Sequence, residues 1–325
     1  MSLTLSLAVD RYDRHFPFFD GTVKPPPGIE LKVFQVGQTV VLRDGEFRHE
    51  RMIHDKEFDV CEFSLSSYLM ARDRGLDLTA VPVFPRRLFS AGLFYVRADS
   101  AIHSPADLVG RRVGVNSFQT TLSVLARGDL KAEYGVPWEE MTWCVGNAEK
   151  VAFDVKPGVK IVNLGAGADL GRALAEGAID AFIHPHPPHS INDGTVHARR
   201  LFADAAEEER RYIQRNGYFP IMHVMALRPS LVRAHPEVPS IAMDLFAQAK
   251  AISESYYDDP NWSLVVGGRR AFEEDRARFG ADPWPSGLRA NAANLERFVD
   301  YMLDQRLISR RLLLEELFAA PTNKM

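Results

Sequence analysis

Three segments of the sequence place polar side chains at the ends of apolar runs. Gly217–His223 ends in a histidine, Cys61–Tyr68 contains a glutamate and three serines, and Arg112–Gln119 ends in a glutamine. In α/β proteins, polar groups at converging strand ends form the functional site. The three segments therefore predict one site to which each of them contributes.

His223 and Glu62 are the candidate proton-transfer groups. An imidazole exchanges protons near neutral pH, which suits general acid or base catalysis. Glu62 stands between Cys61 and Phe63 in an apolar strand, where desolvation would raise its pKa and favour proton transfer. Two other interpretations stay open, namely a core position for His223 and an ion pair of Glu62 with an arginine such as Arg87. The residue types do not decide which of the two is acid and which is base.

Two expected helix starts carry groups that bind anions. Free N–H groups at a helix N-terminus, together with hydroxyl groups, bind a carboxylate. Two such starts suit an anionic ligand, for example one with two carboxylates. The groups are Ser64, Ser66 and Ser67 at the first helix start, and Gln119, Thr120 and Thr121 at the second.

A run of three histidines follows the apolar strand expected at Ile179–Ile183. His184, His186 and His189 are closely spaced, which suggests metal ligands, but prolines keep the run extended and no acidic partner is adjacent. We therefore predict no metal site. His184 and His186 are expected to face a cleft between two lobes, where His186 would be a reserve acid or base.

The sequence lacks the motifs of common cofactor sites. Gly165–Gly171 resembles a dinucleotide fingerprint, but its third glycine comes one residue late and the next strand ends with Asp180, too soon for the expected acidic residue. Cys61 and Cys144 form no CxxC motif. We therefore predict activity without a cofactor.

Composition narrows the classes of partner. The 325 residues are 46% hydrophobic and 25% charged, with a formal net charge of -4 and no basic run, which gives no surface for nucleic acid. No apolar run reaches membrane-spanning length, and the N-terminal segment lacks the features of a secretory signal. We expect a cytoplasmic protein that binds a small aromatic or organic acid, without nucleic acid or membrane; a homodimer stays open.

Strand and helix patterns alternate along the chain, which indicates a mainly parallel α/β architecture. Chain crossings expected near Tyr95–Ala98 and Pro220–Val224 would make one lobe from residues 1–97 and 224–325, and a second from 98–223. The expected strands are Leu3–Val9, Ile29–Val36, Asp59–Phe63, Thr79–Phe84, Ala91–Arg97, Arg112–Val115, Lys160–Leu164, Ala178–Ile183 and Met222–Arg228. The expected helices are Val41–His54, Ser64–Asp73, Thr120–Tyr134 and Leu170–Glu176. After the strand Met222–Arg228, mostly helical structure is expected through Phe318, broken at Pro260, Pro283 and Pro285.

Several segments together resemble the 4,5-dihydroxyphthalate decarboxylase family. Each is weak alone, but their order and spacing from about residue 4 to residue 236 are specific. The segments are Asp10–Arg14, Glu62–Tyr68, Pro82–Phe89, Gln119, Arg127–Gly128, Glu133–Val136, Asp180–Pro185 and Phe219–His223.

The resemblance implies a two-lobed type II periplasmic-binding-protein-like fold, with a ligand cleft between the lobes, used for enzymology. It also implies a set of site residues at matching positions: Tyr12, Arg14, Glu62, Ser64, Arg87, Gln119, Arg127 and His223. The chain departs from the family at His184–His186, where the family has a small residue, proline and arginine. Imidazole cannot replace the bidentate guanidinium, so the resemblance does not extend to the exact substrate.

The expected function is decarboxylation of a hydroxylated aromatic acid, similar to the conversion of 4,5-dihydroxyphthalate to 3,4-dihydroxybenzoate. The alternative is a binding protein or cytoplasmic sensor for a small organic anion, because fold alone does not decide function. The predicted catalytic residues are His223, Glu62 and His186. The predicted substrate-binding residues are Tyr12, Arg14, Ser64, Arg87, Gln119, Thr121, Arg127 and His184.

Overall fold

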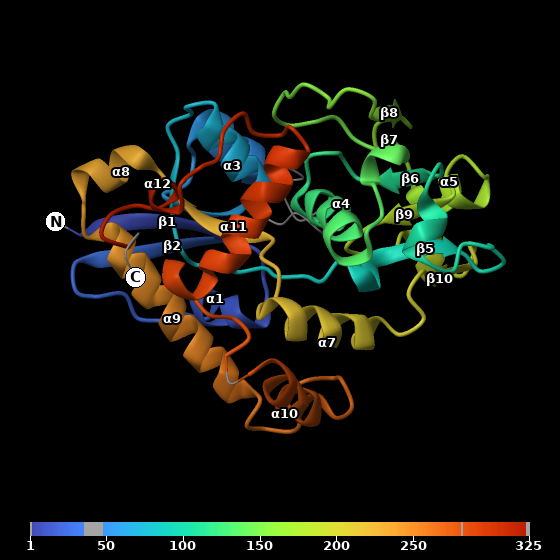
Figure 1. The fold of residues 1–325 in the computed structure, drawn as a ribbon. Coiled ribbons are helices and arrows are strands. Elements are labelled where there is room, and N and C mark those ends of the chain that lie inside the picture. Colours follow the sequence, from blue (N-terminus) through green and yellow to red (C-terminus); the bar gives the residue numbers. More distant parts are fainter. Residues whose placement is uncertain (1, 36–47, 281, 323–325) are drawn as a thin grey trace. The chain divides into compact units, whose positions relative to one another are not determined.

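The computed structural model describes residues 2–35, 48–280 and 282–322, and the chain divides into two compact units (Figure 1). Unit 1 comprises Met1–Arg87, Ile221–Leu295 and Leu312–Met325, and unit 2 comprises Leu88–Pro220 and Glu296–Arg311. Each unit contains its own β-sheet. The predicted α/β class is confirmed.

The sheet of unit 1 has the strand order β2-β1-β3-β11-β4. β1 (Leu3–Val9) is parallel to β2 (Ile29–Gln35) and to β3 (Val60–Ser64). β11 (His223–Leu227) is antiparallel to both β3 and β4 (Thr79–Val81). The carboxyl ends of β1 and β3 therefore lie at the same edge of the sheet as the amino end of β11.

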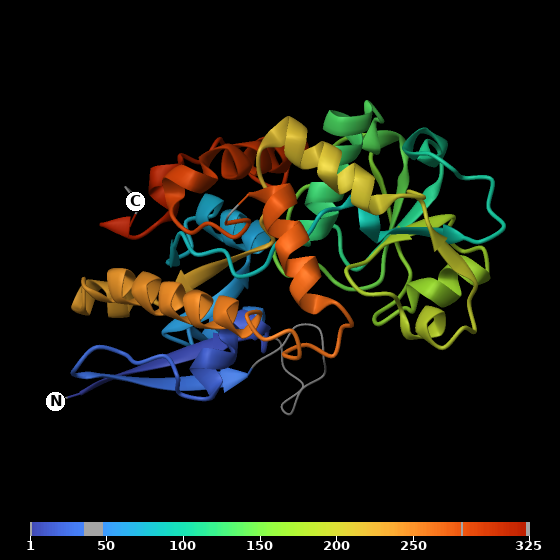
Figure 2. The same ribbon diagram turned by 90° about the horizontal axis from the view of Figure 1, so that it is seen from below.

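One face of this sheet packs against α9 (Val238–Tyr256), which runs along the strands in Figure 2. Val60 and Met225 belong to the hydrophobic core formed with α9. Because side chains two residues apart in a strand share a face, Glu62 and His223 lie on the α9 face as well. The apolar alternation that builds this core thus also orients the candidate pair.

β3 leads directly into α3 (Leu65–Asp73). Ser64 is the N-cap of α3, and its hydroxyl oxygen accepts a hydrogen bond from the N–H of Ser67 at 3.5 Å. All of β3 and most of α3 are buried. The helix start predicted at Ser64 is confirmed.

The sheet of unit 2 has the strand order β10-β5-β9-β6-β7-β8. β6 is parallel to β7 and β9, whereas β5 is antiparallel to β9 and β10. α4 (Thr121–Tyr134) follows β6. The strands are β5 (Phe94–Arg97), β6 (Arg112–Val115), β7 (Thr142–Val145), β8 (Lys160–Asn163), β9 (Ala181–Ile183) and β10 (Ala198–Arg200).

The remaining helices are mostly short. The longest of them, α11 (Leu288–Asp304), begins in unit 1 and ends in unit 2. The others are α1 (Phe16–Phe19), α2 (Arg48–Glu50), α5 (Leu170–Ala175), α6 (His189–Asn192), α7 (Ala205–Asn216), α8 (Pro229–Ala234), α10 (Gly268–Phe279) and α12 (Leu314–Leu317), with the helical turns η1 (Asp13–His15), η2 (Arg51–Asp55), η3 (Ala91–Leu93), η4 (Pro105–Leu108) and η5 (Trp138–Glu140).

The division of the chain differs from the predicted lobes at two places. The first change of unit falls between Arg87 and Leu88 rather than near 95–98, because β5 pairs with the strands of unit 2. Residues 296–311 also cluster with unit 2, although they were expected in the first lobe. Much of the predicted helix Val41–His54 lies outside the described residues.

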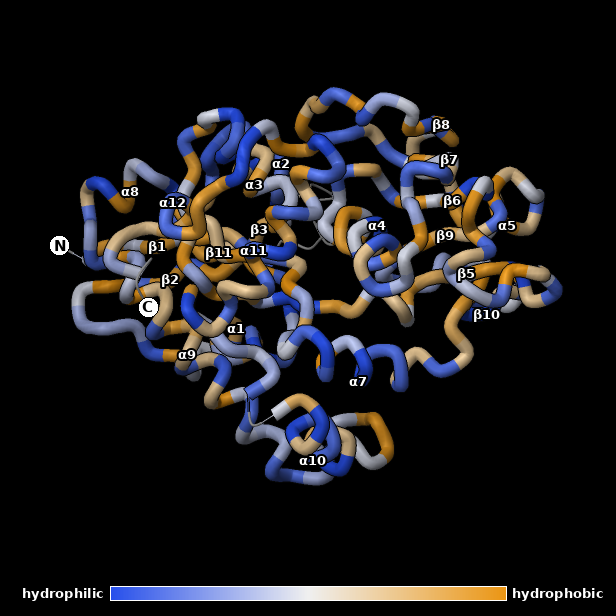
Figure 3. The backbone as a smooth tube through the Cα atoms, in the orientation of Figure 1, coloured by the Kyte–Doolittle hydropathy of each residue, from blue (hydrophilic) through white to orange (hydrophobic). Residues whose placement is uncertain are grey.

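Hydropathy follows this architecture. Figure 3 shows hydrophobic colour concentrated in the strands and hydrophilic colour along α7. Within the described ranges, we found no helix long and apolar enough to cross a membrane.

Candidate active site

The edge of the unit 1 sheet where β1 and β3 end carries a group of buried charged residues. Glu62 lies in β3, His223 begins β11, Asp10 directly follows β1, and Arg48 comes from α2. Their exposed fractions are 4% for Asp10, 0% for Arg48, 0% for Glu62 and 7% for His223. We refer to these four residues as the charge cluster.

Glu62 and His223 are in direct contact. Nδ1 of His223 lies 2.5 Å from Oε1 of Glu62. The strand register pairs His223 with Ser64, which makes Glu62 its diagonal neighbour on the same face of the sheet. Oε2 of Glu62 accepts a hydrogen bond from the N–H of Asp10 at 3.1 Å. Both carboxylate oxygens of Glu62 are therefore held by protein groups.

Arg48 is the cation of the charge cluster. Its Nη1 lies 2.9 Å from Oδ2 of Asp10 and its Nη2 lies 3.2 Å from Oε1 of Glu62. Its Nε–H also donates to the main-chain carbonyl oxygen of Glu62 at 2.8 Å. One planar guanidinium thus binds two buried carboxylates in a fixed geometry.

The ionisation of Glu62 is opposite to the sequence-based prediction. Burial opposes its ionisation, but the charge of Arg48 and the hydrogen bond from His223 outweigh burial and hold the pKa of Glu62 well below its ordinary value. The desolvation argument left out a buried cation, whereas the alternative interpretation, an ion pair of Glu62 with an arginine, agrees with the contact to Arg48. Glu62 is ionised near neutral pH and can only accept hydrogen bonds.

His223 is neutral under the same conditions. Burial lowers the pKa of His223 to about 4, and the hydrogen bond and charge of Glu62 oppose this only in part. Because the Glu62 carboxylate is an acceptor, Nδ1 of His223 must carry the proton, which leaves a lone pair on Nε2. The arrangement makes Nε2 a base, with Glu62 placed to stabilise the imidazolium that forms when Nε2 takes up a proton.

Two further residues join the charge cluster through Asp10. The hydroxyl of Tyr12 donates to Oδ2 of Asp10 at 3.2 Å, and burial, followed by the charge of Glu62, raises the pKa of Tyr12. Nδ1 of His15 lies 2.7 Å from the carbonyl oxygen of Asp10, and burial lowers the pKa of His15 to about 4. Tyr12 is therefore a protonated phenol and His15 a neutral imidazole near pH 7.

Arg14 makes its contacts away from the carboxylates of the charge cluster. Its Nε–H donates to the carbonyl oxygen of Pro85 at 2.6 Å. Its guanidinium carbon lies 4.1 Å from the ring centre of Tyr12 and 4.4 Å from that of Trp284. These aromatic contacts fix the plane of the guanidinium.

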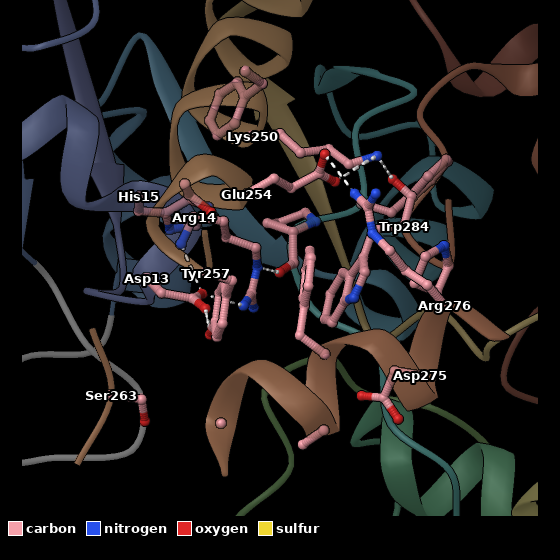
Figure 4. A pocket seen from close by; sticks show the side chains of 18 of the residues that line it. Asp13, Arg14, His15, Lys250, Glu254, Tyr257, Ser263, Asp275, Arg276 and Trp284 are labelled. Carbon is pink, nitrogen blue, oxygen red and sulfur yellow. Dashed lines mark hydrogen bonds and ion pairs between the residues drawn. The ribbon is translucent and has the colours of Figure 1, made fainter. Parts of the chain in front are cut away.

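Arg14 and His15 line a cavity of about 390 Å³ within unit 1 (Figure 4). Glu62 and His223 are not among the residues of its lining. The cavity is thus separate from the Glu62–His223 pair, although the hydrogen bond from His15 to Asp10 connects the two.

The hydroxyls at the start of α3 contact one another. Oγ of Ser64 lies 3.1 Å from Oγ of Ser66, in addition to its capping bond from Ser67. Ser64 is 8% exposed and stands opposite His223 in the strand register. Of the predicted anion-binding hydroxyls, Ser64 is therefore adjacent to the charge cluster.

Arg87 holds a different part of unit 1. Its Nη2 donates to Oδ1 of Asn291 at 2.6 Å and to the carbonyl oxygen of Pro285 at 2.9 Å, and the residue is 2% exposed. Burial lowers the pKa of Arg87 to about 9. The arginine that pairs with Glu62 is Arg48, not Arg87.

The segment just before α4, which carries Gln119, binds a carboxylate of the protein itself. The N–H groups of Phe118 and Gln119 donate to Oε1 and Oε2 of Glu149 at 2.6 and 3.0 Å. The side-chain oxygen of Gln119 accepts from the N–H of Val151 at 3.1 Å. Thr121 is 4% exposed at the same helix start.

Arg127 is fully buried in unit 2. Its Nε–H donates to Oε1 of Gln305 at 2.8 Å, its Nη2 donates to the carbonyl oxygen of Phe118 at 2.5 Å, and its guanidinium carbon lies 3.6 Å from the ring centre of Phe118. Burial lowers the pKa of Arg127 to about 9. These contacts give Arg127 a packing role, and carboxylate binding by it stays a prediction.

The histidine run follows β9, as expected. Nδ1 of His184 lies 2.5 Å from the carbonyl oxygen of His186, and the two rings are 6.2 Å apart. His189 is 3.5 Å from Asp193. In the part of the chain that the structure describes, no three His, Cys, Asp or Glu side chains are grouped to hold a metal ion.

The structure thus gathers part of the predicted set. Glu62, His223, Tyr12 and Ser64 lie at or beside the charge cluster, whereas Arg14 and Arg87 lie elsewhere in unit 1. Gln119, Thr121, Arg127, His184 and His186 belong to unit 2.

Sequence reasoning gave no role to Arg48, Asp10 or His15. Asp10 lies in a segment that resembles the family and directly follows a strand, and this position could have indicated a site residue. Arg48 carried no local signal, because its carboxylate partners are distant in sequence.

Comparisons with known proteins place the chain among related sequences and folds. Residues 39–152 match the family model described as NMT1/THI5 like. By structure, the chain is similar to the periplasmic aliphatic sulphonate binding protein SsuA from Escherichia coli, with a TM-score of 0.59 at 14% identity, covering 100% of this chain and 94% of that one. It is also similar to a mutant of the desulfurization enzyme DSZB in complex with biphenyl-2-sulfinic acid, with a TM-score of 0.54 at 18% identity, covering 99% and 98%. The predicted two-lobed periplasmic-binding-protein-like fold is confirmed.

By sequence, the chain is 34% identical to a 4,5-dihydroxyphthalate decarboxylase from Pseudomonas putida over 62% of this chain and 78% of the relative. It is 35% identical to a 4,5-dihydroxyphthalate decarboxylase from Comamonas testosteroni over 97% of this chain and 96% of the relative. Because that match extends over nearly the full length of both chains, the protein belongs to the 4,5-dihydroxyphthalate decarboxylase family.

Proposed function

We propose that the protein is a carboxy-lyase that decarboxylates a hydroxylated phthalate-type acid, with 4,5-dihydroxyphthalate as the first substrate to test. The observation that carries the proposal is the buried Glu62–His223 pair, in which an ionised carboxylate fixes a neutral imidazole as a base. The nearly full-length similarity to one 4,5-dihydroxyphthalate decarboxylase, and the partial similarity to a second, support the same reaction.

The reaction exchanges one carbon–carbon bond for one carbon–hydrogen bond. A base removes the proton of the phenol para to the leaving carboxylate, and the oxygen electrons move into the ring. The ring carbon that bears the carboxylate accepts a proton, the bond to the carboxylate breaks, and carbon dioxide leaves. The electron pair of that bond restores the aromatic ring, and the phenolate recovers its proton. One proton is consumed in total.

We assign the base to Nε2 of His223. When Nε2 accepts the phenol proton, the resulting imidazolium lies against the carboxylate of Glu62, which is already ionised. The positive charge is therefore stabilised by a fixed partner that needs no rearrangement. Glu62 does not supply the proton for the ring carbon, because it is deprotonated and both of its oxygens accept hydrogen bonds.

Arg48 and Asp10 position this pair. Arg48 keeps Glu62 ionised, and the N–H of Asp10 fixes its second oxygen. Ser64 stands opposite His223 across the strand register, and we assign its hydroxyl to a polar group of the substrate. Each of these residues acts before the chemical step, by setting geometry and charge.

The test is a direct assay of carbon dioxide release from 4,5-dihydroxyphthalate and a panel of hydroxybenzoates and phthalates. We expect release of carbon dioxide with formation of an equimolar amount of the decarboxylated aromatic product, and we expect His223→Asn to lose this activity. Tight binding of these acids without carbon dioxide release would instead identify a binding protein. We place the reaction in the cytoplasm, and fractionation of producing cells checks that assignment.

A further inference from the structure

The cavity of unit 1 has the dimensions of a small-molecule site. It encloses about 390 Å³ between α9, α10 and the residues around Arg14 and Trp284 (Figure 4). Ligand pockets begin at roughly 300 Å³ and are mainly apolar with a few placed polar groups. Aromatic side chains, among them Phe246 and Phe272, form much of this lining.

Two buried polar groups of the lining have capacity for a ligand. His15 is 1% exposed and Ser253 is 4% exposed. Nδ1 of His15 must donate to the carbonyl oxygen of Asp10, because a carbonyl only accepts, so Nε2 is an acceptor. Within the described residues, neither Nε2 of His15 nor Oγ of Ser253 has a hydrogen-bond partner. Neither atom is among the fully buried polar atoms that lack a partner, so both remain accessible to a small ligand.

The positive groups of the lining are already engaged. Lys250 is paired with Asp282 and donates to the carbonyl oxygen of Trp284 at 3.0 Å. Arg276 lies 3.0 Å from Glu254. Arg14 is held by the Pro85 carbonyl group and by Asp13. To pair with one of these cations, a carboxylate ligand would have to displace the protein group that the cation already binds.

The negative groups of the lining are engaged as well. Asp13 accepts the hydroxyl of Tyr257 at 2.6 Å. Asp275, on α10, interacts electrostatically with Arg278. The cavity thus combines aromatic walls and a buried acceptor with charged groups that are already engaged within the protein, which favours an uncharged ligand over an anion or a cation.

We propose that this cavity is a second binding site, which takes an uncharged phenol. The ring occupies the aromatic part of the cavity, the hydroxyl donates to Nε2 of His15, and the hydroxyl of Ser253 completes the hydrogen bonding. A simple phenol keeps its proton near pH 7, as tyrosine does. The proposal does not depend on decarboxylation, because Glu62 and His223 do not line the cavity.

Calorimetric titration of the full chain with phenol tests the proposal. Ser253→Leu removes the hydroxyl and fills part of the cavity, and is expected to weaken phenol binding at least tenfold. His15→Phe keeps the ring packing against Phe246 but removes the acceptor, and a loss of about five- to tenfold corresponds to one hydrogen bond. Ser255→Leu, on the exposed side of the same helix, is the matched control and should bind phenol like the wild type.

Benzoate and phenethylammonium are the charged probes, and both should bind more weakly than phenol. Unchanged phenol affinity in Ser253→Leu and His15→Phe, tighter binding of either charged probe, or no phenol binding to the folded wild type would each overturn the proposal. Thermal melts establish that each variant is folded. If one of the two variants does not fold, the phenol affinity of the other still tests the proposal. A protein without decarboxylase activity that still binds phenol in this way would refute the proposed function and leave the second site standing.

Discussion

Replacing Glu62 by glutamine tests the central electrostatic argument. The change keeps the size of the side chain but removes the charge that faces His223. Nδ1 and Oε1 are 2.5 Å apart, so the charge centres of an imidazolium and a carboxylate in this position lie about 4 Å apart. At an effective dielectric constant near 20, that attraction is worth about 4 kcal/mol.

This energy appears only after His223 has taken up a proton, so it stabilises the transition state and not the resting enzyme. Since about 1.4 kcal/mol corresponds to a factor of ten in rate, kcat of Glu62→Gln should fall about 10³-fold. The KM should change little, because Glu62 is fully buried and is not assigned to the substrate. The assay is steady-state carbon dioxide release at saturating substrate.

Asp59→Asn is the matched control. Asp59 is also a buried carboxylate of unit 1, held by Ser6 and by Arg228, but it is not part of the charge cluster. This variant should lose stability while the folded enzyme keeps its kcat. If Glu62→Gln folds normally and retains kcat within about threefold, the stabilisation of an imidazolium by Glu62 is refuted.

His223→Asn should reduce kcat by roughly 10²–10⁴-fold with the fold retained, because asparagine cannot take up a proton; a normal kcat in the folded variant would contradict the assignment. Arg48→Met should lower the free energy of unfolding by about 3–5 kcal/mol, measured in urea, because it leaves two buried carboxylates without their cation. The free energy of unfolding should fall as the pH is lowered from about 6.5 to 4. In this range, His15 binds a proton in the unfolded chain but stays neutral in the folded protein. In His15→Gln, that slope should decrease by up to about 1.4 kcal/mol per pH unit. Arg87→Lys should lower stability by about 1–3 kcal/mol at unchanged KM, whereas a raised KM would return Arg87 to the substrate site.

Local patterns in the sequence predicted many strands and helices of the fold, but not β7, β10 or α7, and the predicted strand Ala91–Arg97 begins with the helical turn η3. Leu3–Val9 and Arg112–Val115 were predicted with the bounds that the structure has, because apolar residues mark a strand in either case. The same patterns do not say which sheet a strand joins. Phe94–Arg97 is an apolar strand that fits either lobe, and only its pairing with β9 and β10 places it in unit 2.

The candidate site was predictable where strand ends carry it and not where tertiary contacts decide it. Glu62 and His223 were recognised from their place beside apolar strands. The sign of the pKa shift of Glu62 was wrong because it depends on Arg48, whose partners are set by the folded chain. The segment leading into α4 was recognised as able to bind an anion, but no local pattern indicates that Glu149, about 30 residues further along the chain, binds its N–H groups.

The contact of Glu149 with the N–H groups of Phe118 and Gln119 means that this carboxylate competes with any free anion for them. A carboxylate attached to the same chain acts at an effective concentration of the order of millimolar when its linker is short and flexible. Any free carboxylate that binds the N–H groups of Phe118 and Gln119 must displace it, so its apparent affinity there is reduced by the occupancy of Glu149. A free anion therefore binds these two N–H groups only if it is concentrated or brings additional contacts.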